Sequence, residues 1–401
     1  RNLNRAGARL IVFDVEFSEP NHNSPGEDSL LAEALRQAGN VILPGKVGYL
    51  YDRNLEKPYT TLIPPLPLLA AACRRFGLVN ELTDPDDFTR RYLLYLPVGG
   101  KLEPSLGLAT LRAMLTIPDS AQVEIQGRTC RFGKLTIPLY DRYSTLINYY
   151  GPAGSFPALS LASVLDDSSL DLGPGVDSDY MENFFSDKVG SVTGVKNPFA
   201  GKVILIGAMS EELHDTKNTP FYDYHGTPRK MSGVEVHAHA LQTILDGAFI
   251  HRLSVFTSLL FSVLLAWLIF RLVGSYRLLR GLLLSLAVSV GMVAAAQVAF
   301  SLWNVWVDLV SLLYAALLTY LGTAIYLYFR ERREKLSIQE MFEHYVPDQV
   351  VKELIANPEL LKLGGQRCHL SMLFADINGF TTICENLTPE QLVAHLNEYM
   401  T

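Results

Sequence analysis

Residues 8–17, ARLIVFDVEF, set the architecture of the first part of this chain. The run is apolar almost without interruption over the length of one strand, which is typical of a strand buried on both faces of a sheet. Residues 201–209, GKVILIGAM, have the same character. Two such strands, far apart in the sequence, predict a parallel sheet that is covered on both faces.

The segments that follow the first strand support this prediction. Residues 27–39, EDSLLAEALRQAG, have the pattern of an amphipathic helix that ends at a glycine, and residues 40–47, NVILPGKV, read as another strand. Strands that alternate with helices are typical of α/β domains. We therefore expect residues 1–252 to form an α/β domain with a largely parallel sheet.

Two acidic residues near the end of the first strand are candidates for reading a signal. Ligands of open parallel sheets tend to bind beyond the carboxyl ends of the strands, where Asp14 and Glu16 lie. Their side chains should point to the same face because they are two residues apart in a strand. An ion pair or a helix cap is the simpler explanation of both residues.

Four histidines of the same region, His214, His225, His237 and His239, resemble a metal-binding set. However, His237 and His239 are two residues apart on a predicted helix, and side chains at that spacing do not face each other. We expect packed or capping histidines.

Four cysteines, Cys73, Cys130, Cys368 and Cys384, show no spacing typical of a metal site. Cys73 and Cys130 could form a disulfide in an exported domain, or remain two separate thiols.

Three apolar segments predict helices that cross a membrane. The first, residues 253–270, LSVFTSLLFSVLLAWLIF, carries no charge, and the others run from about 281 to 303 and from about 305 to 329. A helix of about 20 apolar residues spans the hydrocarbon layer of a bilayer. The overall composition, 49% hydrophobic, agrees with a protein that contacts lipid.

The basic residues predict the orientation of these helices, since cytoplasmic loops collect lysine and arginine. They cluster after the first and third segments and are absent from the turn WNVW between the second and third; the clusters are Arg271, Arg277 and Arg280, and Arg330, Arg332, Arg333 and Lys335. We expect a multi-pass protein of the cell inner (plasma) membrane. Residues 1–252 would be extracytoplasmic, which requires a preceding span or export signal, and residues 330–401 cytoplasmic.

The outer region also resembles a known sensor family. The blocks GARLIVFDVEFSEP (7–20), GKVILIGAM (201–209) and MSGVEVHAHALQTIL (231–245), followed by three spans, resemble the second type of CHASE domain. That family comprises extracellular sensors of bacterial signalling enzymes. The resemblance implies that residues 1–252 sense an extracytoplasmic ligand, whose identity the sequence does not give.

Near the end of the chain, an apolar run carries an aspartate into a glycine turn. LSMLFADI (370–377) reads as a buried strand and NGFTTICENL (378–387) as a turn into a helix. Asp376 would offer the carboxylate oxygen that Mg²⁺ prefers, Gly379 allows a tight turn, and the first N–H groups of the helix are free to bind phosphate. A short turn of this kind can also simply cap a helix.

The stretch LFADINGFT (373–381) resembles the first motif of class III nucleotide cyclases, and the charged, helix-patterned residues 330–366 before it resemble the transducing element of such enzymes. The resemblance implies that Asp376 is a catalytic residue that binds metal together with the Ile377 carbonyl. The backbone of Asn378, Gly379, Phe380 and Thr381 would hold the phosphates, and two Mg²⁺ or Mn²⁺ ions would serve each site.

Residues 367–401 would then begin an α+β, ferredoxin-like catalytic domain that forms a homodimer, converts ATP to cyclic AMP and pyrophosphate, and has its remaining active-site residues beyond Thr401. A guanylate cyclase, or a receptor with a degenerate, non-catalytic cyclase-like domain, remains open. The net charge of −7 gives no basic surface, so nucleic acid is not expected as a partner.

Overall fold

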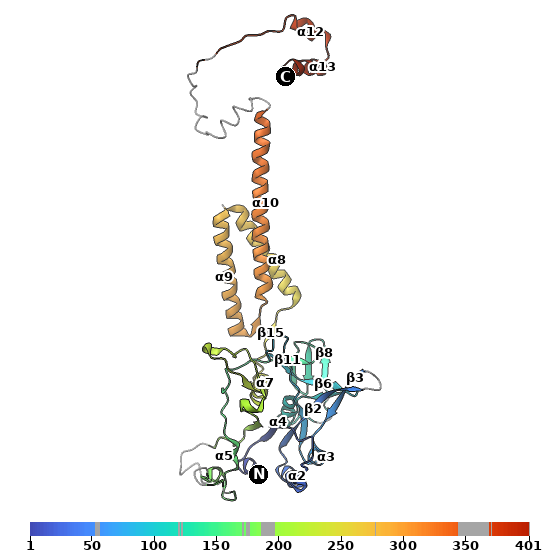
Figure 1. Ribbon diagram of the computed structural model, residues 1–401, viewed down its shortest axis with the longest axis vertical. Helices are drawn as coiled ribbons and strands as arrows, with labels where there is room; N and C mark the ends of the chain where they lie inside the picture. Colours follow the sequence, from blue (N-terminus) through green and yellow to red (C-terminus); the bar gives the residue numbers. More distant parts are fainter. Residues whose placement is uncertain are drawn as a thin grey trace. The chain divides into compact units, whose positions relative to one another are not determined.

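The chain is described here from a computed structural model, which covers residues 1–52, 57–118, 121, 123–170, 172–173, 177–185, 197–276, 278–343, 369 and 371–400. It divides into two compact units, residues 1–324 and residues 325–401. Each unit is described by itself below (Figure 1).

The first unit is built on a sheet in which four strands run parallel. β1 (Leu10–Asp14) lies between β12 (Val203–Gly207) and β2 (Val41–Asp52), and β4 (Arg75–Leu78) pairs with β2 on its other side. The second half of β2 forms an antiparallel hairpin with β3 (Lys57–Ile63). The predicted largely parallel sheet is therefore confirmed.

Helices cover both faces of this sheet, which explains why its strands are apolar at successive positions. Ile11 and Leu43 pack toward α1 (Asn2–Arg5), α2 (Pro25–Ala38) and α3 (Pro67–Ala70). Leu10, Val12 and Ile42 pack on the opposite face against α4 (Leu106–Met114). The predicted helix α2 is present and ends, as expected, at Gly39, which is in the left-handed conformation.

Smaller elements complete the domain around a third hydrophobic cluster, and α7 (Gly233–Asp246) contributes its buried face to that cluster. The short antiparallel sheets pair β5 (Arg91–Leu93) with β11 (Ser144–Leu146), β6 (Tyr95–Val98) with β7 (Lys101–Pro104), β9 (Thr129–Phe132) with both β8 (Val123–Gln126) and β10 (Leu135–Pro138), and β13 (Thr216–Lys217) with β14 (Met231–Ser232). The remaining helices are α5 (Leu161–Leu165), η1 (Tyr180–Phe184), η2 (Glu211–Leu213) and η3 (Tyr224–Gly226).

Cys73 and Cys130 belong to different hydrophobic clusters, and both are free thiols. The sequence left open a disulfide or two separate thiols, and the structure contains two separate thiols.

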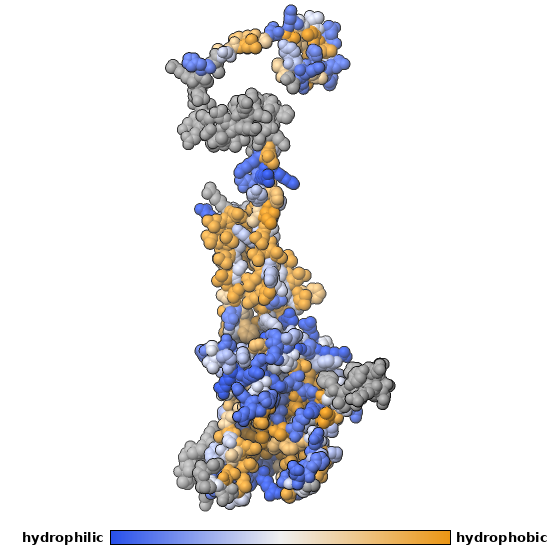
Figure 2. All heavy atoms as spheres, in the orientation of Figure 1, coloured by the Kyte–Doolittle hydropathy of each residue, from blue (hydrophilic) through white to orange (hydrophobic). Residues whose placement is uncertain are grey.

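Three long helices follow the domain: α8 (Val255–Ser275), α9 (Leu278–Trp303) and α10 (Leu309–Glu343). All of α8 and α9, and Leu309–Ser337 of α10, are long and apolar enough to cross a membrane. Their large apolar side chains are mostly exposed, and Figure 2 shows the hydrophobic surface that results. The three predicted spans are confirmed as helices, but their boundaries differ from the prediction.

The differences lie at the helix ends. α8 continues past residue 270 and includes Arg271, whose long side chain can reach the headgroup region. The third helix, α10, begins at Leu309 instead of at residue 305. There, Val305 and Trp306 form the short strand β16, which pairs in parallel with β15 (His251–Arg252). Backbone pairing to β15 is the physical reason why the third helix starts late.

The second unit comprises the end of α10, the helix α12 (Phe380–Asn386) and the helix α13 (Pro389–Met400). α10 continues without a break from its apolar part to Glu343, so the first residues of the predicted charged helix are confirmed. The rest of that predicted segment, residues 344–366, lies outside the described residues.

The predicted buried strand at 370–377 is wrong where the structure describes it. Residues 371–377 have no regular secondary structure, and the side chains of Leu373 and Phe374 are 92% and 90% exposed. A strand needs a neighbour to receive its backbone hydrogen bonds. Within the described part of residues 325–401, no strand offers those bonds.

Candidate functional site

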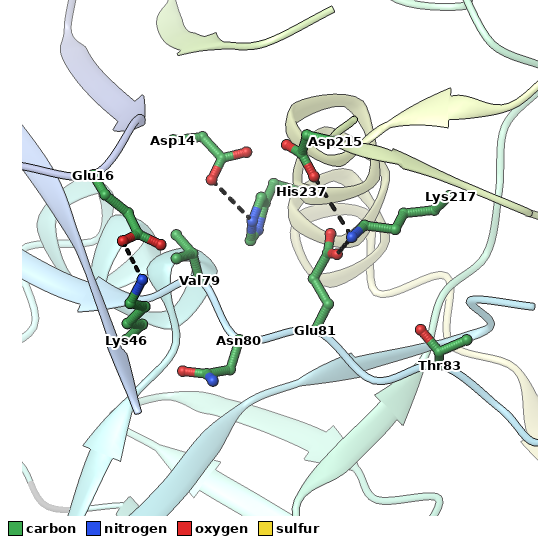
Figure 3. A pocket seen from close by; sticks show the side chains of 10 residues that line it. All are labelled: Asp14, Glu16, Lys46, Val79, Asn80, Glu81, Thr83, Asp215, Lys217 and His237. Carbon is green, nitrogen blue, oxygen red and sulfur yellow. Dashed lines mark hydrogen bonds and ion pairs between the residues drawn. The ribbon is translucent and has the colours of Figure 1, made fainter. Parts of the chain in front are cut away.

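A polar cavity of about 410 Å³ lies at the carboxyl ends of the parallel strands of the first unit. Figure 3 shows the side chains that surround it: Asp14, Glu16, Lys46, Val79, Asn80, Glu81, Thr83, Asp215, Lys217 and His237. A volume of this size is within the range of small-molecule sites, and the ends of parallel strands are where α/β sheets usually bind ligands.

Asp14, the last residue of β1, is the most unusual group in this cavity. Its side chain is only 9% exposed, and among the described residues its Oδ2 atom has no hydrogen-bond partner. Burial, followed by the nearby charges of Asp215 and Glu81, raises the pKa of Asp14 to about 8. A buried carboxylate without a donor is costly, so this group is poised to accept a proton or a cationic partner.

His237 enters the cavity from α7 and is held as a neutral imidazole. The Tyr92 hydroxyl accepts a hydrogen bond from the Gly107 N–H at 2.9 Å and lies 2.6 Å from His237 Nδ1. The hydroxyl can also donate its own proton to Nδ1, and in that arrangement the ring proton is on Nε2. Burial lowers the pKa of His237 to about 4. The Nε2 atom faces Asp14, and with the ring proton on Nε2 it is a donor toward that side of the cavity.

A glycine at position 107 is required for this arrangement. A Cβ atom at Gly107 would lie 2.7 Å from the Tyr92 hydroxyl oxygen, closer than non-bonded atoms allow. Any larger residue would displace the hydroxyl that contacts His237 Nδ1.

The two lysines of the cavity are already paired. Lys46 forms an ion pair with Glu16, and Lys217 forms one with Glu81 and lies 3.5 Å from Asp215. Burial of Lys217 disfavours its charged form, but Glu81 and Asp215 outweigh this effect and raise its pKa. The lysines therefore neutralise other carboxylates and leave Asp14 without a cationic partner.

The loop that carries Glu81 is fixed by Asn80. The Asn80 amide accepts a hydrogen bond from the Val47 N–H at 2.7 Å and donates one to the Val47 carbonyl at 3.0 Å. This pair of bonds ties the residues after β4 to the middle of β2. Glu81 is buried by this loop, and burial raises its pKa.

The sequence identified only part of this site. Asp14 and Glu16 line the same cavity, as predicted, and Glu16 is in the ion pair that was the simpler explanation. Glu81, Asp215 and Lys217 were missed because they come from loops and a two-residue strand that have no sequence signature. Glu81 could have been found, since it lies three residues after another parallel strand, β4.

The other histidines do not join the cavity. His239 is completely buried on a different side of α7, where its Nδ1 accepts a hydrogen bond from the Tyr150 N–H and its ring contacts Phe156. His214 and His225 are exposed. The prediction that His237 and His239 are packed histidines with separate surroundings is confirmed.

Within the described ranges, one group of three acidic side chains is close enough to share an ion: Asp166, Asp177 and Asp179. Asp166 already accepts hydrogen bonds from the backbone N–H groups of Ser178, Asp179 and Tyr180. Its carboxylate therefore acts as the organiser of a loop, and these bonds lower its pKa although burial opposes them.

The predicted turn at the end of the chain has the expected shape. Gly379 has φ +75°, which favours glycine, and α12 begins at the next residue, Phe380. The Phe380 N–H donates to the Ile377 carbonyl at 3.2 Å. Asp376 and Asn378 are exposed on either side of Ile377, and Thr381 lies in the first turn of α12.

A contact at the domain-facing ends of the apolar helices connects them to the domain that holds the cavity. The rings of Tyr140 and Trp306 stack with centroids 6.3 Å apart, and the Arg252 guanidinium lies over both rings at 5.9 and 5.3 Å. The His251 N–H donates to the Asn304 carbonyl at 2.8 Å. We call Tyr140, Arg252 and Trp306 the junction.

Comparison with known proteins agrees with this architecture. The family model of the CHASE2 domain matches residues 1–276, which include the cavity, β15 and all of α8. Neither a search of curated proteins nor a search of solved structures found a match to the chain. The match covers more than half of the chain, and three helices are apolar enough to cross a membrane. This chain therefore belongs to the CHASE2 domain family and is a membrane sensor.

Proposed function

We propose that this protein is a membrane-bound adenylate cyclase that an extracytoplasmic signal regulates, and that it converts ATP to cyclic AMP and pyrophosphate. The observation that carries the proposal is the LFADINGFT motif at residues 373–381, with Gly379 in the left-handed conformation and a helix starting immediately after it. It stands after a CHASE2 domain and three apolar helices, the order expected of a receptor enzyme.

In this proposal the CHASE2 domain lies outside the cytoplasm of a cell inner (plasma) membrane, and the motif lies inside. The basic residues support this orientation. Arg271 and Arg280 lie at the adjoining ends of α8 and α9, and Arg330 lies in the last turns of the candidate span Leu309–Ser337 of α10. The turn WNVW around Asn304, at the opposite end of these helices, carries no basic residue, although Arg252 of β15 lies beside it.

The signal would pass through α7 and the junction. His237 in the cavity belongs to the second turn of α7, which ends at Asp246, and β15 begins five residues later at His251. A helix of 14 residues is about 21 Å long and behaves as a rigid rod. A shift of α7 would therefore move Arg252, whose contact with Trp306 lies at the start of α10.

At the cytoplasmic end, the donor set around the turn fits a hard metal ion. Asp376 offers carboxylate oxygens and Ile377 a backbone carbonyl with a second lone pair, and oxygen ligands of this kind suit Mg²⁺ or Mn²⁺. Bound there, a pair of ions would activate the ribose hydroxyl and neutralise the triphosphate. The chain itself contributes the negative charge of Asp376 and the backbone N–H groups of residues 378–381, which would hold the phosphates in a homodimeric site.

The test is cyclic nucleotide synthesis by the full-length protein in membranes, with ATP or GTP as substrate and Mg²⁺ or Mn²⁺ present. We expect cyclic AMP, and we expect Asp376→Asn to lower the rate by about 10²- to 10³-fold because one oriented charge is lost. Glu390→Gln, which removes an exposed charge from α13, serves as the matched control and should keep the wild-type rate.

Three outcomes would overturn the proposal. Synthesis of cyclic GMP instead would indicate a guanylate cyclase. No product with either substrate would indicate a receptor with a non-catalytic cyclase-like domain. Near-normal synthesis by Asp376→Asn would remove the metal role from this residue.

A further inference from the structure

The cavity of the CHASE2 domain holds more negative than positive charge. Four carboxylates line it, those of Asp14, Glu16, Glu81 and Asp215, against the two ammonium groups of Lys46 and Lys217. Both lysines are engaged with the other three carboxylates, and His237 is neutral. The cavity is thus complementary to a positively charged ligand.

We propose that this cavity binds a small organic cation, a protonated primary amine, whose N–H group donates to the unpartnered Oδ2 atom of Asp14. The inference rests on the proposed role of the domain as a sensor and names the class of ligand that it reads. The Asp14 side chain is more than nine-tenths buried, and its Oδ2 atom lacks a partner among the described residues. An ammonium group would supply the missing donor and the missing charge in one contact.

A second, unpartnered acceptor lies across the same cavity. Glu81 Oε1 is buried without a hydrogen-bond partner within the described residues, while its Oε2 atom is held by Lys217. The three N–H donors of an ammonium group can serve more than one such acceptor. His237 Nε2 faces Asp14, and with the ring proton on this atom it would donate to a hydroxyl or carbonyl oxygen next to the amine.

A bare metal ion fits the cavity less well than an amine does. A volume of about 410 Å³ exceeds what one ion needs, and the carboxylates around the cavity are not among the described acidic groups that converge on a common point. The ligand must also be polar, because Val79 is the only apolar side chain among the ten that line the cavity.

Binding of an amine must release a proton from Asp14. Burial raises the pKa of this group to about 8, so the empty cavity carries it mostly protonated at pH 7, while the cation requires the ionised form. The other charged or titratable groups that face Asp14 are Glu16, Lys46, Glu81, Asp215, Lys217 and His237. With one proton released per ligand, the affinity should rise about tenfold per pH unit between pH 6 and 7 and level off above pH 8.

The experiment is isothermal titration calorimetry of the full-length protein in lipid nanodiscs with ethanolamine and with putrescine as probes. Ethylene glycol and 1,4-butanediol are their uncharged counterparts. We expect at least one amine to bind, its diol not to bind, and one proton to be released per amine at pH 7, measured from the difference between two buffers of unequal ionisation enthalpy.

Asp14→Asn keeps the shape of the side chain and should weaken amine binding by about 30-fold or more, as expected for the loss of one partner of a buried charge pair. Glu124→Gln, an exposed position on β8, is the matched control and should bind as the wild type does. The proton count is measured on the wild type, so the test stands even if Asp14→Asn does not fold.

The inference is overturned if neither amine binds at millimolar concentration, if the diols bind equally well, if Mg²⁺ or Ca²⁺ binds in place of the amines, or if Asp14→Asn binds amine as the wild type does. Amine binding without cyclase activity would contradict only the proposed enzyme. Cyclase activity without amine binding would contradict only the proposed ligand.

Discussion

The Oδ1 atom of Asp14 lies 3.7 Å from the Nε2 atom of His237, beyond hydrogen-bonding distance, although both side chains are almost completely buried. Here the Tyr92 hydroxyl holds the imidazole from the other side, at 2.6 Å from Nδ1. The two groups therefore share a cavity without satisfying each other, which leaves both available to a ligand.

This arrangement predicts how the stability of the domain depends on pH. The pKa of Asp14 is raised to about 8. Its contribution to the free energy of unfolding therefore falls as pH rises from about 4 to 8. Burial lowers the pKa values of His237 and His239 to about 4. Their contribution to the free energy of unfolding therefore rises from pH 4 to 6.5 and is constant above pH 6.5. Stability should therefore decrease between pH 6.5 and 8, by about 2 kcal/mol for the single proton of Asp14.

Thermal unfolding of the wild type and of Asp14→Asn, followed by circular dichroism at pH 6.5 and 8, measures this dependence. We expect the decrease to be smaller or absent in Asp14→Asn and unchanged in Glu124→Gln. Glu81, whose pKa is also raised, acts in the same direction in all three proteins. Parallel curves for the wild type and Asp14→Asn would show that Asp14 is ionised throughout this range.

Removing the Tyr92 hydroxyl should destabilise the domain. Tyr92→Phe leaves the Gly107 N–H without its acceptor and His237 Nδ1 without its hydrogen-bond partner, and an unsatisfied buried polar group costs about 1–3 kcal/mol. Tyr224→Phe is the control, because Tyr224 is 47% exposed. The melting temperature should fall for the first variant only, and equal melting temperatures would contradict the hydrogen bonds described for Tyr92.

The junction can be tested through the backbone amides that it protects. Tyr140→Ala removes the ring that stacks on Trp306, while Tyr140→Phe keeps that ring. We expect hydrogen exchange at the His251 and Leu253 amides, which donate to the segment before α10, to become faster in Tyr140→Ala only. If exchange at both amides is the same in all three proteins, the stacked ring does not hold the two strands together.

The proposed orientation predicts the accessibility of single cysteines. In a cysteine-free background, Glu124→Cys in the CHASE2 domain should react with an impermeant maleimide on intact spheroplasts. Glu331→Cys, in the charged last turns of the candidate span Leu309–Ser337, should react only after lysis. The reverse pattern of labelling would invert the topology.

The main sheet could be predicted from the sequence because burial on both faces leaves a direct pattern. Ile11 and Leu43 face one layer of helices, and Leu10, Val12 and Ile42 face the other, so these strands are continuous apolar runs. The three apolar helices could be predicted for a similar reason, since contact with lipid requires apolar residues on all sides. In both cases the environment of each residue follows from neighbours close in the sequence.

The full set of cavity residues and the absence of a strand at residues 371–377 could not be predicted from local sequence patterns. Asp14 was identified from its place at a strand end, but Lys217 reaches the cavity from a strand of two residues whose position depends on its pairing with β14. The apolar run around Leu373 has the composition of a strand, yet strand formation depends on a partner supplied by other parts of a chain. Contacts between distant segments decide both cases.

The pairing of β15 with β16 has a consequence for biosynthesis. β15 precedes α8 and β16 follows α9, so the two strands can meet only after the whole helical hairpin has been made and both of its helices have entered the bilayer. The stack of Tyr140 on Trp306 likewise needs a residue made after both helices, whereas the residues of the three hydrophobic clusters all come before α8. Every residue of the polar cavity is therefore made before the segment that pairs with β15, and the contacts of the junction require a chain in which both helices have been completed.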